Sequence, residues 1–156
     1  MCALFGGGCM NDNMLFTKQC TIDNKGRLFL STKNTGIKSG EKIYLFYSDE
    51  RDCIIVRSEE CIRNIGSQYN GCNPKEKEEK LVELGDFFFN CIGTTIVDKQ
   101  GRINVGVEAC SEVNIVGSAF AIGCFDEVRL YSSADVYRAS IIAKRENKLK
   151  TLGSLL

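Results

Sequence analysis

Two arginines in this chain end the same five-residue pattern, which begins with an aspartate and has a glycine just before the arginine. The first copy is 23–27 (DNKGR) and the second is 98–102 (DKQGR). An aspartate side chain can bond the backbone two residues on, and a glycine can adopt positive φ, so each pattern predicts a tight turn. An arginine held out on such a turn can donate two parallel hydrogen bonds to guanine or bind a phosphate. Arg27 and Arg102 are therefore candidate nucleic-acid contacts.

An alternative partner is present inside each turn. Arg27 can pair with Asp23, and Arg102 with Asp98, so that the guanidinium locks the turn instead of reaching DNA. The residue types and spacing do not separate these two arrangements. The turn-forming residues of the prediction are therefore Asp23, Gly26, Asp98 and Gly101, whichever partner the arginines take.

The two turns belong to an internal repeat. Residues 21–30 are echoed by residues 96–105 at a constant offset of 75 positions. Apolar residues alternate with polar or outward residues after each turn, which is typical of a strand with one buried face. Further strands are expected at 42–47 and 52–57, and residues 48–51 form a polar connection suited to a hairpin. Each half is therefore predicted to run as strand, tight turn, strand, short helical turn and hairpin, followed by a helix.

Capping signals place the helices. Ser58 with two glutamates, and residues 132–135 (SSAD), predict helix starts near the end of each half, with helices of roughly 59–65 and 134–149. Between the halves, Asn73, Pro74 and Glu76 form a capping box with proline at the first helical position. A helix is expected from Pro74 to Leu84, with Gly85 ending it.

These elements predict a mainly β, α+β fold in which two β-hairpin repeats pack into one pseudo-twofold, β-barrel-like domain. Half-units of about 45 residues are too small to bury a core alone, so the halves should share one. The expected organisation is a flexible tail at 1–14, a first repeat at 15–65, a helical connection at 66–90, a second repeat at 91–143 and a C-terminal tail at 144–156.

Composition excludes several classes of protein. Apolar residues make up 44% and charged residues 26% of the 156 residues, which indicates a packed globular protein. No apolar run approaches the roughly 18 residues that span a bilayer, so we expect a cytoplasmic protein with no membrane partner. The nine cysteines include no Cys-x-x-Cys pair and there is no histidine, which disfavours a zinc site; we expect no metal and no cofactor.

Taken together, the paired turns and the repeated strands resemble the MraZ family, a branch of the AbrB-like (SpoVT-AbrB) swapped-hairpin regulators, over roughly residues 15–148. The resemblance implies a homo-oligomeric ring that binds double-stranded DNA upstream of division and cell-wall genes, and a nucleoid-associated location. It implies DNA contacts at Arg27 and Arg102, with Lys25 beside the first. Lys99 and Lys33 are further candidate DNA contacts. The chain has Leu30-Ser31 and Val105-Gly106 where the family usually has Ile-Pro after the arginine strand.

The net charge is zero, but its distribution is uneven. Residues 18–42 contain six basic and two acidic residues, a net charge of +4, whereas residues 104–128 contain four acidic residues and no basic one, a net charge of −4. The positive half of one subunit could therefore meet the negative half of the next and close a ring. Random scatter of surface charge is the alternative.

Two other functions remain open. An enzyme is disfavoured because histidine is absent and no nucleophile, phosphate-loop or dinucleotide motif occurs, so we expect no catalysis and no small-molecule substrate. A protein-binding module or scaffold is the stronger alternative, since swapped-hairpin folds also serve as antitoxins, and the basic and then apolar segment 144–156 could dock on a partner. The duplicated turn favours the regulator.

Overall fold

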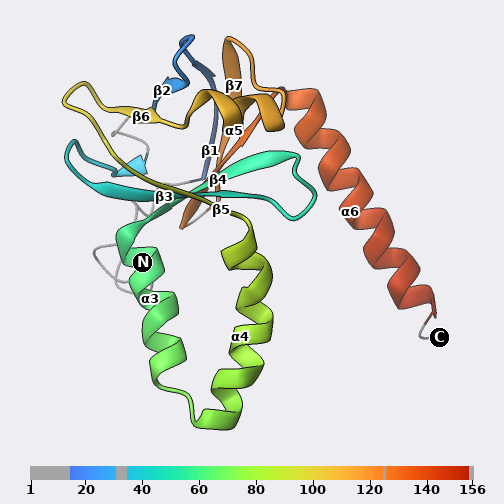
Figure 1. Cartoon of the computed structure of the whole chain (residues 1–156). Coiled ribbons are helices and arrows are strands. Elements are labelled where there is room, and N and C mark those ends of the chain that lie inside the picture. Colours follow the sequence, from blue (N-terminus) through green and yellow to red (C-terminus); the bar gives the residue numbers. More distant parts are fainter. Residues whose placement is uncertain (1–14, 31–34, 125, 155–156) are drawn as a thin grey trace.

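The computed structural model describes residues 15–30, 35–124 and 126–154. The fold is mixed α+β, with a six-stranded sheet and a separate two-stranded sheet. The helices pack against the larger sheet or project away from it (Figure 1). The predicted tail at 1–14 lies outside the described residues, as does Lys33. Among the helices of the described residues, none combines the length and apolar character needed to cross a membrane.

Each half supplies four strands in the predicted order. In the first half the elements are β1 (Phe16–Thr21), β2 (Arg27–Phe29), β3 (Lys42–Tyr47), β4 (Cys53–Ser58) and α3 (Glu59–Asn70). Helix α4 (Pro74–Phe89) connects the halves. The second half contains β5 (Cys91–Ile96), β6 (Arg102–Asn104), α5 (Val107–Glu112), β7 (Ser118–Cys124), β8 (Glu127–Tyr131) and α6 (Ala134–Ser154).

The strands of the two halves interleave. The larger sheet has the order β1-β7-β8-β4-β3-β5, and every neighbouring pair is antiparallel. The smaller sheet pairs β2 with β6. The two halves therefore share one core, because four of the six strand pairings join a strand of one half to a strand of the other. The ladders of the described residues do not join β1 to β5, so the expected barrel-like closure is not confirmed.

Two layers of apolar side chains lie on opposite faces of the large sheet. The larger layer includes Leu28 from β2, Ile103 from β6 and Ala109 from α5, and lies between these elements and the sheet. The smaller layer centres on Phe46 and Tyr131, which pack with side chains of α3, α4 and α6. In Figure 1, β2, β6 and α5 accordingly lie on one side of the sheet, and α3 and α4 extend away on the other.

The helices are longer than the sequence predicted. Helix α3 continues to Asn70 and α6 to Ser154, so α6 runs into the segment assigned to the C-terminal tail. Helix α4 does not end at Gly85 but continues to Phe89. A glycine inside a helix costs only about 1 kcal/mol, and the following turn places the ring of Phe87 4.3 Å from that of Phe46. Burial of the Phe87 ring offsets the free-energy cost of Gly85, so the helix continues past this glycine.

The predicted capping box at the start of α4 is confirmed. The backbone N–H of Glu76 donates to Asn73 Oδ1 at 2.9 Å, and the N–H of Asn73 donates back to Glu76 Oε1 at 3.2 Å. Each bond satisfies a backbone donor that the helix itself leaves unpaired.

Candidate nucleic-acid interface

Both Asp-x-x-Gly-Arg segments form the predicted turn, with matching hydrogen bonds. In the first, Asp23 Oδ1 accepts from the N–H groups of Lys25 and Arg27 at 3.0 and 2.9 Å. In the second, Asp98 Oδ1 accepts from the equivalent N–H groups of Gln100 and Arg102 at 2.9 and 2.8 Å. The glycine of each turn has φ of 79°, in the left-handed region that disfavours a side chain. The repeated sequence therefore produces the same turn twice.

The arginine of each turn binds the aspartate of the same turn. Arg27 Nε donates to Asp23 Oδ2 at 2.7 Å, and Arg102 Nε donates to Asp98 Oδ2 at 2.8 Å. The internal pairing that the sequence left open is thus present. It uses one edge of the guanidinium, while both arginine side chains remain 33% exposed. The pairing holds each guanidinium in place without removing it from solvent.

The same contacts lower the pKa of both aspartates. The largest cause is the hydrogen bond from the backbone N–H of the arginine, and the guanidinium itself adds to it by hydrogen bonding and by its charge. The carboxylates of Asp23 and Asp98 therefore stay ionised well into acid solution, and the arginines stay anchored over the same range of pH.

The two turns meet because β2 and β6 form one antiparallel ribbon. Its register pairs Arg27 with Asn104 and Phe29 with Arg102. Leu28 and Ile103, between them, are 0% and 1% exposed and face the core. Because side chains alternate across a strand, the four flanking residues lie together on the outer face of the ribbon. This face brings the two candidate arginines onto one short surface, which we call the ribbon face.

Lysines surround the ribbon face. Lys18 Nζ, from β1, lies 6.0 Å from the centre of the Phe29 ring. Lys25 and Lys99 lie within the two turns and are exposed. With the two arginines they supply five positive charges, against two negative charges from Asp23 and Asp98. The ribbon face is therefore locally basic although the chain as a whole is neutral. The fifth predicted contact, Lys33, lies outside the described residues.

A close backbone approach fixes the first turn against the second half. The carbonyl of Gly26 accepts from the N–H of Val105 at 2.8 Å. A Cβ at Gly26 would lie 2.6 Å from the carbonyl carbon of Gly106, a distance that real Cβ atoms do not show. Glycine is thus required at position 26 both for its φ and for this packing.

Three residues of this surface were not singled out from the sequence: Lys18, Phe29 and Asn104. Strand alternation places Phe29 and Asn104 opposite the buried Leu28 and Ile103, so the pattern contained part of the signal. The missing information was that β2 pairs with β6, because a pairing between segments so far apart in the sequence is not specified by local pattern. Lys18 comes close only through the fold of β1.

The described cysteines form no group with other acids or cysteines that could hold a metal ion. Those at positions 20, 53, 61, 72, 91, 110 and 124 form no disulfide among the described residues. Burial raises the pKa of several of them, among them Cys53 and Cys110, which keeps these thiols protonated and unreactive.

No protein-family model and no curated protein matches the chain. The resemblance to the MraZ family therefore rests on the paired turns and the repeated strands.

Proposed function

We propose that the protein is a sequence-specific DNA-binding transcription regulator of the MraZ type, and that the ribbon face reads the major groove. The observation that supports this most is the placement of two buttressed arginines on one outward face of a two-stranded ribbon. The major groove of B-form DNA admits a two-stranded β-ribbon. Arginine is the most frequent partner of guanine there, and asparagine pairs with adenine in the same way.

Anchoring by aspartate supports base reading in particular. Each Nε is held by a carboxylate, and the terminal amino groups of Arg27 and Arg102 have no partner among the described residues. A guanidinium fixed in this way loses little rotamer freedom when it binds a base. Lys25 and Lys99, at the edges of the ribbon, are suited to phosphates, which set affinity but carry no sequence information.

The pseudo-twofold, barrel-like arrangement of the two repeats is part of the proposal, and the strand order supports its pseudo-twofold relation. Counterparts are β1 and β5, β3 and β7, and β4 and β8. The order β1-β7-β8-β4-β3-β5 becomes its own reverse when each strand is exchanged for its counterpart. The same exchange maps β2 onto β6. On this proposal the ribbon lies on the pseudo-axis, and the two turns meet DNA in equivalent ways.

Oligomerisation would raise the affinity for DNA even though the monomer has no net positive charge. The segment 18–42 carries a net charge of +4 and the segment 104–128 a net charge of −4, so a head-to-tail ring of copies has complementary charges. A ring repeats a weak DNA contact and increases avidity. The target genes proposed by the resemblance are those of division and the cell wall, and the location is the cytoplasmic nucleoid.

The test is selection from random-sequence duplex DNA, followed by measurement of Kd for the enriched site. Arg27→Ala combined with Arg102→Ala should weaken binding at least about 30-fold, since each bidentate contact contributes about 1–3 kcal/mol. The matched control is Arg63→Ala with Arg138→Ala, which removes two arginines that are 71% and 69% exposed on α3 and α6. Circular dichroism checks folding. A double variant that binds as tightly as the parent contradicts the proposal.

Lysine variants separate base reading from phosphate binding. Lys25→Ala and Lys99→Ala should each weaken binding to all sequences alike and reduce the slope of log K against log salt by about 1. The arginine variants should instead change which sequences are enriched. If the lysine and arginine variants behaved alike, the ribbon would bind DNA without reading it.

A second candidate function is that of a protein-binding module or scaffold. The observation that favours it is α6, whose outer part exposes Ile142, Leu149 and Leu152 at 54%, 63% and 50%. In Figure 1 this helix leaves the sheet and extends away from it. Failure of DNA selection with the parent protein would favour this candidate.

A further inference from the structure

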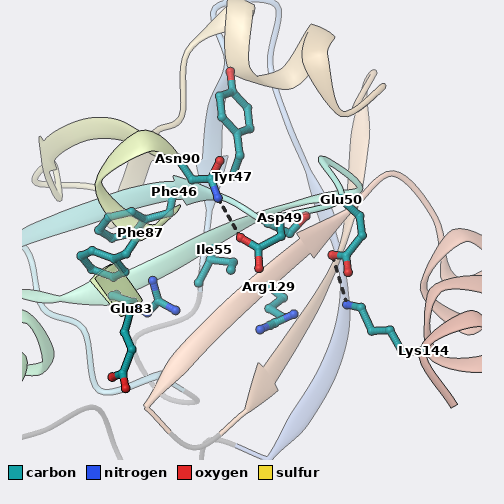
Figure 2. Close-up of a pocket in the computed structure, with 12 residues that line it drawn as sticks. Phe46, Tyr47, Asp49, Glu50, Ile55, Glu83, Phe87, Asn90, Arg129 and Lys144 are labelled. Atoms are coloured by element: carbon teal, nitrogen blue, oxygen red, sulfur yellow. Dashed lines mark hydrogen bonds and ion pairs between the residues drawn. The ribbon is translucent and has the colours of Figure 1, made fainter. Parts of the chain in front are cut away.

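A cavity lies on the face of the large sheet opposite the ribbon. The cavity has a volume of about 360 Å³ and is bounded by strand residues, by the loop after β3, by α4 and by α6. Figure 2 shows Asp49, Arg129 and Lys144 around one part of it, and Phe46, Phe87 and Glu83 around another. This size suits a small metabolite.

The floor of the cavity carries two arginines that share one carboxylate. Arg57 on β4 pairs with Glu127 on β8 in the sheet register, and Arg129 lies two residues further along β8 on the same face. Glu127 Oε2 lies 3.1 Å from Arg129 Nε and 3.9 Å from Arg57 Nη2. The two guanidinium groups therefore carry one positive charge more than Glu127 neutralises.

Both arginines are partly withdrawn from water. Their side chains are 18% and 28% exposed, so the excess charge lies in a recess and not on open surface. Burial lowers the pKa of Arg129, but Glu127, Tyr131 and Cys53 together raise it by more, and the net shift is upward. Arg129 thus stays cationic, and the recess retains its attraction for an anion.

Aromatic rings orient Arg57. Its guanidinium carbon lies 5.0 Å from the centre of the Phe46 ring and 5.1 Å from that of Phe87. A guanidinium stacked on rings keeps its N–H groups directed outward in its own plane. In this geometry they can donate two parallel hydrogen bonds to a planar carboxylate. The rings, with Ile55 beside them, also supply an apolar wall.

Three acidic side chains also line the cavity. Asp49 accepts a hydrogen bond from Asn90 Nδ2 at 2.9 Å, and Glu83 on α4 pairs with Lys80 at 3.1 Å. Glu50 pairs with Lys144 at 3.8 Å and joins the loop to α6. Of these three carboxylates, only Asp49 has no cationic partner among the described residues, so it is the one that complements an ammonium group. The cavity thus offers a cationic floor, one unpaired carboxylate and an apolar wall.

We propose that this cavity binds a free amino acid, with its carboxylate on Arg57 and Arg129, its ammonium toward Asp49, and an apolar side chain against Phe46, Ile55 and Phe87. The ligand is bound and not transformed. The proposal does not depend on DNA binding by the ribbon, since the two sites lie on opposite faces of the sheet.

The test uses the full chain, with the twenty L-amino acids and inorganic phosphate as probes, each at about 10 mM, a concentration that detects binding in the millimolar range. Binding is followed by NMR through the arginine Nε–Hε signals and by calorimetry. At least one apolar amino acid should bind and shift the signals of Arg57 and Arg129. Its amide, which lacks the carboxylate, and its deaminated acid, which lacks the ammonium, should each bind at least about tenfold more weakly.

Three outcomes would overturn the proposal. They are that no amino acid binds, that the amide binds as well as the amino acid, or that inorganic phosphate is the only probe to bind. These measurements need no variant and so do not depend on the folding of one.

Variants then locate the site. Arg57→Gln and Asp49→Asn should each weaken binding of the best amino acid at least about tenfold, because each removes one charged partner. The matched control is Arg63→Gln, whose side chain is 71% exposed on α3. Equal binding by Arg57→Gln and the parent would place the ligand elsewhere.

Discussion

The two Asp-x-x-Gly-Arg turns have the same internal geometry but different surroundings. Both have glycine φ of 79° and a bond from arginine Nε to the aspartate. At Gly26 an added Cβ would overlap the backbone of Gly106, at 2.6 Å from its carbonyl carbon. At Gly101 the nearest atom among the described residues is Cε2 of Phe29, at an ordinary 3.5 Å. A repeated sequence thus reproduces its local turn, and the rest of the fold decides how strictly each copy is required.

This difference separates two roles of the turns. The first turn is packed into the second half, through the bonds from the N–H groups of Val105 and Gly106 to the carbonyl of Gly26, so it also holds the halves together. The second turn meets a flexible side chain of the ribbon. We therefore expect changes at Gly26 to affect the whole fold, and changes at Gly101 to affect mainly the turn.

The largest expected effect comes from alanine at the two glycines. Gly26→Ala should lower the free energy of unfolding by about 3 kcal/mol or more, since it combines left-handed strain with overlap of backbone atoms. Gly101→Ala should cost only about 1–2 kcal/mol, which is the strain alone. Urea unfolding followed by circular dichroism measures both. Equal losses would mean that the contact with Gly106 relaxes at little cost.

How far the sequence predicted this arrangement depends on the range of the interactions. The turns, the capping box of Asn73 and Glu76, and the hairpin at 48–51 were predicted because each depends on neighbours a few residues away. The pairing of β2 with β6 was not, since it joins distant segments. The arginines were therefore identified one at a time, and only the structure places them on one face.

The boundaries of α4 and α6 show the same limit. A glycine often ends a helix, but at Gly85 the helix continues because Phe87, in the next turn, packs on Phe46.

The two arginines of the cavity, Arg57 and Arg129, were not identified from the sequence, because neither lies in a motif and each is an ordinary charged position on a strand. Their shared use of Glu127 depends on the register of β4 with β8.

A smaller effect is expected from pH, and it should be the same for both turns. The folded-state pKa of Asp23 and Asp98 is lowered, so each carboxylate stabilises the fold above its unfolded pKa, near 3.8, and this contribution is lost as the pH falls through the lower, folded value. Asp23→Asn and Asp98→Asn should therefore destabilise the protein at neutral pH, and the difference from the parent should shrink below pH 3.8.

The measurement is urea unfolding of the three proteins at several pH values, with Glu79→Gln as the control because Glu79 is an exposed acidic residue inside α4. If Asp23→Asn and Asp98→Asn lowered the free energy of unfolding by very different amounts, the two turns would share their geometry but not their contribution to stability. A constant gap from the parent across this range of pH would mean that the carboxylate charge is not what stabilises the turns.

The smallest effects concern the caps of the helices that close each half. Ser58 Oγ accepts from the N–H of Cys61 at 3.1 Å and is buried, whereas Ser133 Oγ accepts from the N–H of Val136 at 3.2 Å in a bond that is open to solvent, with Ser133 half-buried. Removing a serine cap costs about 0.5–2 kcal/mol. We expect Ser58→Ala to lie near the upper value, because no water can replace the lost acceptor, and Ser133→Ala near the lower one. Thermal unfolding resolves this difference, and the reverse order would show that α6 depends on its cap more than α3 does.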